Sequence, residues 1–224
     1  LIGTKYMRLH DYAKAIDYLQ KVSPAFLKKQ NITDYLKRNP FEEDWITAKS
    51  EKASIYGDFK PMTMYATSST KLQLCIIMKM LDDKIHILND KEECAVLNYA
   101  YAVGLVQAEK WSWALTQYAK SSDDWNGGLF QSINNLQTDD NGWDYLSSRS
   151  YMLQERYNKV YASLGNAEKL TKNSELLARC QYMRGFIDLD DSHRWQYYRN
   201  LVGTYSKTKF VGSEKRHCDL LRDH

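Results

Sequence analysis

Proline and glycine are scarce in this sequence, whose 224 residues include only 3 Pro and 10 Gly. Both residues interrupt helices, so their scarcity favours long helices over many short strands joined by turns. Hydrophobic residues make up 43% of the chain, which is enough to bury a sizeable core in one or two compact domains. The sequence therefore predicts an all-α protein with negligible strand content.

Long hydrophobic runs and a strong charge of one sign are also lacking. A membrane-spanning helix needs about 20 apolar residues, whereas the richest run, residues 72–81, is shorter and includes Gln73 and Lys79. The net charge is only +3, with 31 basic against 28 acidic residues. We therefore expect no transmembrane segment in this chain and no nucleic-acid partner.

Closely spaced cysteines, which a structural zinc site typically uses, are absent. The four cysteines lie far apart in the chain, at Cys75, Cys94, Cys180 and Cys218. The first three stand among apolar residues of predicted helices, where a thiol packs as a small hydrophobic group. We expect these three to be buried thiols. The even count leaves one or two disulfides open, and with them the cellular compartment.

No catalytic signature is present: the chain lacks a GxSxG motif, a P-loop, a GxGxxG motif and an HExxH motif. Residues 137–148 fail as an EF-hand, because Gln137 and Ser148 stand where the first and last ligands belong. In the C-terminal cluster, His217 and Asp219 cannot both point with Asp223 at one ion, because only residues three or four apart share a helix face. The sequence therefore predicts no catalytic, cofactor-binding or metal-binding residue. Its acidic pairs, Glu42 with Glu43 among them, are interpreted as solvated charges.

Residues 3–24 have the pattern of a helical hairpin. Two short helical segments flank a polar break at residues 8–10. Asp11 is a predicted N-cap, because its carboxylate can accept the N–H groups of the next helical turn. Apolar residues then recur at helical spacing, and Pro24 is interpreted as the stop. Those apolar residues are Tyr12, Ala15, Ile16, Leu19 and Val22.

Further helices follow along the chain. Residues 67–88 predict a helix that is apolar nearly all round and therefore central and buried. The next predicted helix carries small residues at Ala100, Gly104 and Ala108, whose spacing of four lets another helix approach closely. The last predicted elements are a helix ending at Gly165, an antiparallel pair over residues 174–191 and 192–208, and a final helix over residues 212–224.

The hairpin resembles the tetratricopeptide repeat, a helix–turn–helix unit of about 34 residues. Three copies carry the resemblance: Gly3 and Tyr6 with Ala15 and Leu19; Tyr101, Ala102 and Leu105 with Ala114 and Tyr118; and residues 184–185 with residues 195–205. The resemblance implies antiparallel helix hairpins in a degenerate TPR-like α-solenoid. An irregular helical bundle is the alternative.

The predicted domain organisation has three parts that form one continuous array. Residues 1–121 form a helical repeat-like part, residues 122–142 a polar loop or connector, and residues 143–224 a C-terminal helical part. The last third also resembles the ends of large exported bacterial proteins with degenerate TPR-like helices. That resemblance implies a C-terminal piece of a larger protein and an exported, envelope-associated location.

Paired helices stacked in a solenoid leave an extended concave surface. The leading hypothesis is therefore a non-enzymatic binding module for a protein or peptide partner. Glycan binding is an alternative, because four Trp lie within residues 111–143 and aromatic rings offer large stacking areas. An all-helical enzyme is a further alternative. The tentative ligand contacts are Trp125, Trp143, Asp124 and Asn126.

Overall fold

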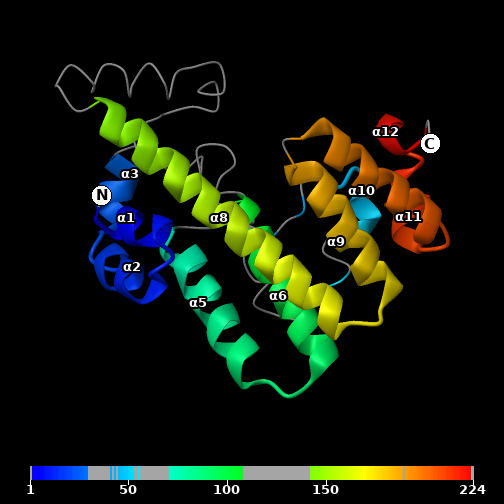
Figure 1. The fold of residues 1–224 in the computed structure, drawn as a ribbon. Helices are drawn as coiled ribbons and strands as arrows, with labels where there is room; N and C mark the ends of the chain where they lie inside the picture. Colours follow the sequence, from blue (N-terminus) through cyan, green and yellow to red (C-terminus); the bar gives the residue numbers. More distant parts are fainter. Residues whose placement is uncertain are drawn as a thin grey trace. The chain divides into compact units, whose positions relative to one another are not determined.

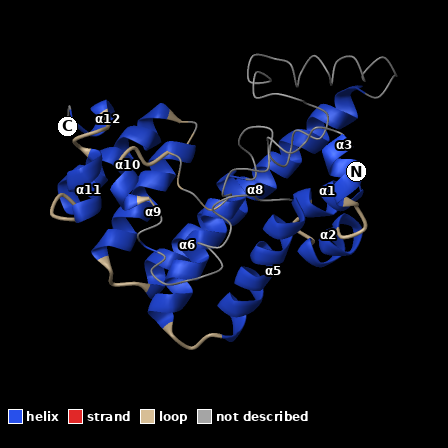
Figure 2. Cartoon of the chain, turned by 180° about the vertical axis from the view of Figure 1, so that it is seen from behind, coloured by secondary structure: helices blue, strands red, loops and turns tan. Residues whose placement is uncertain are grey.

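The structure, a computed structural model, describes residues 2–29, 41, 43, 45–52, 55, 71–107, 142–188 and 190–222. Throughout these ranges the regular structure is helical and contains no strand (Figure 2). The predicted all-α class is therefore confirmed for the described part of the chain.

The helices are labelled in Figure 1. They are α1 (Ile2–Arg8), α2 (Tyr12–Leu19), α3 (Pro24–Lys29), the 3₁₀ helix η2 (Lys49–Glu51), α5 (Lys71–Ile87), α6 (Lys91–Gln107), α8 (Gly142–Leu170), α9 (Ser174–Ile187), α10 (Asp191–Thr204), α11 (Lys209–Glu214) and α12 (Asp219–Arg222).

The chain divides into two compact units, and each collects segments that lie far apart in the sequence. The first unit takes residues 1–40, 64–80 and 104–159, and the second takes residues 41–63, 81–103 and 160–224. The boundaries fall inside α5, α6 and α8, so each of these helices contributes to both units. Residues 122–141 of the expected connector lie outside the described residues. The predicted division into three parts therefore stays a prediction.

The predicted hairpin at the beginning of the chain is formed by α1 and α2. The turn is closed by two backbone hydrogen bonds of 3.0 Å, from His10 N–H to the Met7 carbonyl and from Asp11 N–H to the Tyr6 carbonyl. This is a helix-ending motif that places one residue in the left-handed region, here His10 with φ of 60°. The Asp11 carboxylate accepts the Lys14 N–H at 3.1 Å, which confirms the predicted N-cap.

Pro24 does not act as the predicted stop. Helix α2 ends earlier, at Leu19, and Pro24 is instead the first residue of α3. The Ser23 hydroxyl accepts the Phe26 N–H at 3.2 Å and so caps α3. Proline suits a first helical position, because its missing N–H would have no partner there and its φ is already helical.

The antiparallel pair predicted near the C-terminus is formed by α9 and α10, which pack against each other. Glycine sits at the helix contact in this hairpin and in the α1–α2 hairpin. A Cβ added at Gly185 would lie 2.7 Å from a ring carbon of Tyr198, and one added at Gly3 would lie 2.7 Å from Leu19 Cγ. The first and third TPR-like copies thus fold as helical hairpins. Ala114 and Tyr118 of the second copy lie outside the described residues.

Helix α5 is not buried all round, contrary to the prediction. Ile76 and Ile87 are 42% and 74% exposed, and Asp82 and Asp83 also face solvent. The acidic pair gives α5 a solvent-exposed side, which its largely apolar composition does not indicate. Helix α6 is the deeply buried one, since every side chain from position 97 to position 106 is buried.

Two predicted helix ends are also wrong. Helix α8 runs through Gly165 to Leu170, because Val160, Leu164 and Ala167 form a buried row across that position. Packing of this row outweighs the weak helix propensity of a single glycine. The predicted helix over residues 212–224 is instead split into α11 and α12, with turn residues 215–217 between them.

The cysteine prediction is confirmed for Cys75, Cys94 and Cys180, which are buried free thiols. Cys218 is also a free thiol and is half-buried. Burial raises the pKa of the Cys75 thiol to about 12. A protonated, buried thiol is a poor nucleophile, so this cysteine is structural.

The glycine contact in the α9–α10 hairpin generates a first prediction. Gly185→Ala should lower the free energy of unfolding by about 1–3 kcal/mol, because the added methyl group overlaps the rigid Tyr198 ring. Gly165→Ala is the matched control, since its methyl group would meet only Arg184 Nη2, at 3.7 Å. The control should gain up to about 1 kcal/mol from helix propensity. Urea unfolding measures both, and equal stabilities of the two variants would contradict the described packing.

The N-cap of α10 generates a second prediction. Hydrogen bonds from Ser192 hold the pKa of the Asp190 carboxyl below its ordinary value of about 3.9. A carboxyl whose pKa is lower in the folded state than in the unfolded state stabilises the fold at any pH above its unfolded-state pKa. This stabilisation is lost as the pH falls through the folded-state pKa. Asp190→Asn keeps a side-chain oxygen that can cap α10 but removes the carboxyl group that titrates. The melting-temperature gap between wild type and this variant should therefore narrow from pH 6 to pH 3, and an unchanged gap would contradict the account.

Candidate functional site

The predicted glycan contacts are not placed by the structure. Asp124, Trp125 and Asn126 lie outside the described residues. Trp143 belongs to the first turn of α8, and its side chain is not described. Glycan binding through these four residues therefore stays a prediction.

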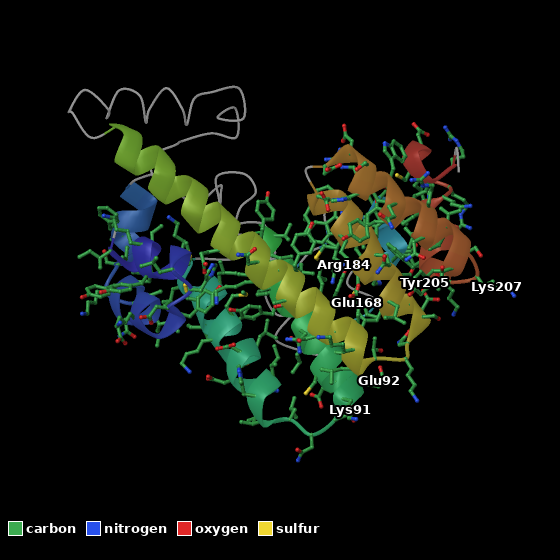
Figure 3. The ribbon with its side chains drawn as sticks, in the orientation of Figure 1. Lys91, Glu92, Glu168, Arg184, Tyr205 and Lys207 are labelled. Atoms are coloured by element: carbon green, nitrogen blue, oxygen red, sulfur yellow. The ribbon has the colours of Figure 1, made fainter. Side chains whose placement is uncertain are left out.

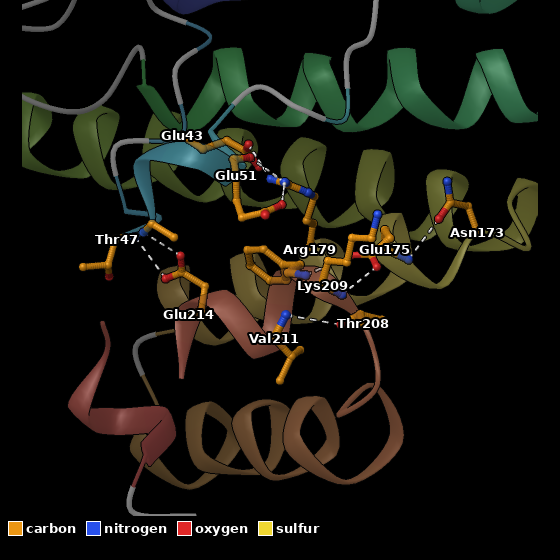
Figure 4. Close-up of polar contacts among 12 residues, drawn as sticks. Glu43, Thr47, Glu51, Asn173, Glu175, Arg179, Thr208, Lys209, Val211 and Glu214 are labelled. Carbon is orange, nitrogen blue, oxygen red and sulfur yellow. Dashed lines mark hydrogen bonds and ion pairs between the residues drawn. The ribbon is translucent and has the colours of Figure 1, made fainter. Parts of the chain in front are cut away.

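A buried ion pair lies in the second unit, between Arg179 of α9 and Glu43 (Figure 4). Arg179 Nη1 lies 2.7 Å from Glu43 Oε2, and Nη2 donates to the Glu51 carbonyl oxygen at 2.5 Å. The Tyr99 hydroxyl donates to the other Glu43 oxygen, and the guanidinium lies 4.8 Å from the ring centre of Phe210. Glu43 is thus completely buried, which corrects its interpretation as a solvated charge.

Two further glutamates bind backbone N–H groups near this pair. Glu175 of α9 accepts the N–H groups of Lys209 and Phe210 at 2.7 and 3.0 Å, at the beginning of α11. Glu214 at the end of α11 accepts the N–H groups of Thr47 and Ala48 at 3.0 and 2.8 Å. Together these residues form a glutamate triangle, made of Glu43, Glu175 and Glu214, that ties α9, α11 and residues 41–52 to one another.

The buried members of the glutamate triangle, Glu43 and Glu214, are out of reach of a substrate. Glu43 and Glu214 are 0% exposed and Arg179 is 2% exposed. A reacting molecule would have to contact one of these groups to exchange a proton with it. We therefore assign these buried charges a structural role.

A second polar network crosses α8, α9 and α10. Arg184 of α9 binds Glu168 of α8 through two hydrogen bonds of 3.0 and 2.9 Å (Figure 3). Gln181 also donates to Glu168, at 3.1 Å, and accepts from Asn200 of α10 at 3.1 Å. Two-point arginine–carboxylate pairs fix orientation as well as adding attraction. This network fixes the α9–α10 hairpin against α8.

The most distinctive surface of the first unit lies on α1 and α2. Ile2, Tyr6 and Leu9 recur at the spacing of one helix face, and Ile2 and Leu9 are 54% and 61% exposed. Lys14 and Tyr18 of α2 and Lys21 just after its end form a matching exposed row. We call these six residues the aromatic–lysine face.

The two rows of this face contact each other through their aromatic rings. The Tyr6 and Tyr18 rings stack with their centres 5.5 Å apart and their planes 15° from parallel. Lys14 Nζ lies 5.4 Å from the Tyr6 ring centre, and Lys21 Nζ lies 5.1 Å from that of Tyr18. Lysine over an aromatic ring is a favourable cation–π geometry. The result is an aromatic pair, half-buried at Tyr6 and exposed at Tyr18, with a lysine at each ring.

Exposed apolar side chains continue beyond the face, at Val22 and at Phe26 of α3. Single exposed apolar residues are ordinary, whereas groups of them mark contact surfaces. The sequence interpretation missed this surface because residues 3–24 were used only to predict a fold. The available signal was that α1 is apolar on two adjoining sides, one with Gly3 and Met7 buried and the other with Ile2 exposed.

No family model matches this chain, and neither a curated protein nor a solved structure matches it. Among the helices that the structure describes, none combines the length and the apolar character needed to cross a bilayer. Within the same ranges, His, Cys, Asp and Glu form no group of three or more that could hold a metal ion. The described side chains therefore carry the functional argument alone.

The buried ion pair generates a third prediction. Glu43→Gln leaves the Arg179 charge buried without its counter-charge, so the free energy of unfolding should fall by about 3–5 kcal/mol. The double variant Glu43→Gln with Arg179→Met removes both charges. It should lose less than the sum of the two single variants, with a coupling of about 1–3 kcal/mol in urea unfolding. Additive losses would show that the two charges do not interact.

Proposed function

We propose that this chain is a non-enzymatic helical binding module whose aromatic–lysine face takes a protein or peptide partner. The observation that carries the proposal is the stack of half-buried Tyr6 on exposed Tyr18, with Lys14 and Lys21 over the two rings. Tyrosine is well suited to contact surfaces, because it supplies a large area with few rotatable bonds.

The face is built on a rigid support. Its two helices approach closely at Gly3, whose missing side chain makes room for Leu19. The side chain of Lys71, in α5, donates to the Thr4 hydroxyl at 3.3 Å and anchors α1 from behind. A surface that is already ordered loses little conformational entropy when a partner binds. This rigidity favours a recognition role for the face.

The proposal assigns no catalytic residue. The Glu43–Arg179 pair is sealed from solvent, and Glu168 is held by Arg184 and Gln181. Acid–base chemistry needs a titratable group that can reach the substrate. These two clusters serve to position helices instead.

The wider architecture is proposed to be TPR-like. The α1–α2 and α9–α10 hairpins support this interpretation, because each has a glycine where its two helices touch. Such hairpins are the units from which helical solenoids are built. The origin as a piece of a larger envelope-associated protein rests on the sequence resemblance alone.

A peptide selection tests the binding function and is the fourth prediction. A displayed library of random peptides is selected on the immobilised chain, and the affinities of enriched peptides are measured by fluorescence anisotropy. Leu9→Ser with Tyr18→Ser should weaken their binding by at least about tenfold, because aromatic and aliphatic anchors supply most of the energy of a small interface.

Ile76→Ser is the matched control, because Ile76 is an exposed apolar residue of α5 outside the aromatic–lysine face. The control variant should bind the selected peptides as wild type does. Peptides that bind the face variant and wild type equally would place the binding site elsewhere. Failure to enrich any peptide would contradict the proposed function.

A further inference from the structure

A second surface of the chain is complementary to the aromatic–lysine face. It comprises the end of α5, the beginning of α6 and the connection between them, residues 82–93. This acidic tip carries five acidic against two basic residues: Asp82, Asp83, Asp90, Glu92 and Glu93 against Lys84 and Lys91. Ile87 within it is 74% exposed, the highest value among the exposed large hydrophobic residues of the described chain.

The tip's carboxylates lie on the surface. Asp82, Asp83, Asp90, Glu92 and Glu93 are all exposed. The Glu92 carboxylate also accepts hydrogen bonds from the Thr171 hydroxyl and the Lys172 N–H of the loop after α8. That contact fixes the beginning of α6 and so holds the acidic tip in a defined position.

The opposite charge gathers at the beginning of the chain. Residues 1–29 include six basic residues and only two acidic ones, although the whole chain has a net charge of only +3. Lys14 is 60% exposed at its side chain, where its Nζ also pairs with Asp11 Oδ2 at 2.9 Å, and Lys21 is exposed as well. Both are held at the Tyr6–Tyr18 stack, so positive charge and apolar area are presented together.

We propose that the aromatic–lysine face is occupied by the acidic tip of a second copy of this chain. The carboxylates of the tip would face Lys14 and Lys21, and Ile87 would pack on the tyrosine stack. Opposite charges attract across such a contact, but exposed ion pairs alone contribute little binding free energy. The burial of Ile87 against the tyrosine rings would add a hydrophobic contribution. The chain itself thus supplies both complementary surfaces.

The two surfaces differ, so the contact is head-to-tail. After one contact has formed, each pair still presents one unused face and one unused tip, and association continues unless it closes into a ring. Exposed charges are screened by salt, so the association must weaken as the ionic strength rises. The inference uses the surface of the proposed function but needs no outside partner.

Sedimentation velocity of the whole chain tests this inference and is the fifth prediction. The mean sedimentation coefficient should rise with protein concentration at low salt and fall back towards the monomer value at high salt. Lys14→Gln with Lys21→Gln neutralises the face, and Asp82→Asn with Asp83→Asn neutralises the tip. Each pair of changes should weaken self-association about tenfold, since each removes two exposed charge pairs.

Mixing the two variants gives the sharpest result. The face variant keeps an intact tip and the tip variant keeps an intact face, so the mixture should form a one-to-one complex that grows no further. Lys159→Gln with Lys207→Gln is the matched control, because both lysines are exposed and lie outside the two surfaces. This control should associate as wild type does.

A wild-type chain that stays monomeric at low salt over the whole concentration range would overturn the inference. A face variant that associates as tightly as wild type, or a mixture that forms no complex, would overturn it equally. None of these results affects the proposed function, which is judged by peptide affinity. A monomeric chain whose face still binds selected peptides would leave that function standing and remove only the second copy as occupant.

Discussion

The arrangement of the second unit depends on one buried charge, the guanidinium of Arg179. An isolated charge in a protein interior is strongly unfavourable, so its partner Glu43 must be present and correctly placed. Residues 41–52 bring that partner in, and among those of them that the structure describes the only helix is the short η2. Their backbone N–H groups are instead satisfied in part by Glu214, and the Trp45 carbonyl accepts a hydrogen bond from the Tyr182 hydroxyl. Side chains here replace the hydrogen bonds that a longer helix would supply.

In the described chain, the buried charges hold helices in place, whereas the exposed charges are available for binding. Glu43 and Glu214 of the second unit point at arginine and at backbone N–H groups, where they fix helices and are closed to solvent. Lys14, Tyr18 and Lys21 of the α1–α2 hairpin are exposed, where contact with another molecule is possible. Function is better argued from such exposed chemistry than from a helical fold, because the same helical architecture supports many activities.

Local patterns were sufficient to predict the all-α class, the Asp11 cap, the α9–α10 pair and the buried cysteines, because each depends on residues close together in the sequence. Glu43 could not be predicted in the same way. Its partner Arg179 is 136 positions away, and Glu214 binds backbone 166 and 167 positions away. The helix through Gly165 was missed for a related reason, since tertiary packing decides it. The spacing of Ile2, Tyr6 and Leu9 indicates one helix face. Spacing alone does not tell an exposed row from a buried one, so the aromatic–lysine face could be recognised only from the exposure of its side chains.

The central claim is that the glutamate triangle holds α9, α11 and residues 41–52 together as one cooperative structure. Native-state hydrogen exchange of the Thr47, Ala48, Lys209 and Phe210 amides tests it most directly, because these N–H groups are the ones bound by Glu214 and Glu175. Groups that open in one cooperative event share one opening free energy. The account predicts a common value for the four amides, and a common decrease in Arg179→Met. Four unrelated opening free energies, or no change in that variant, would contradict it.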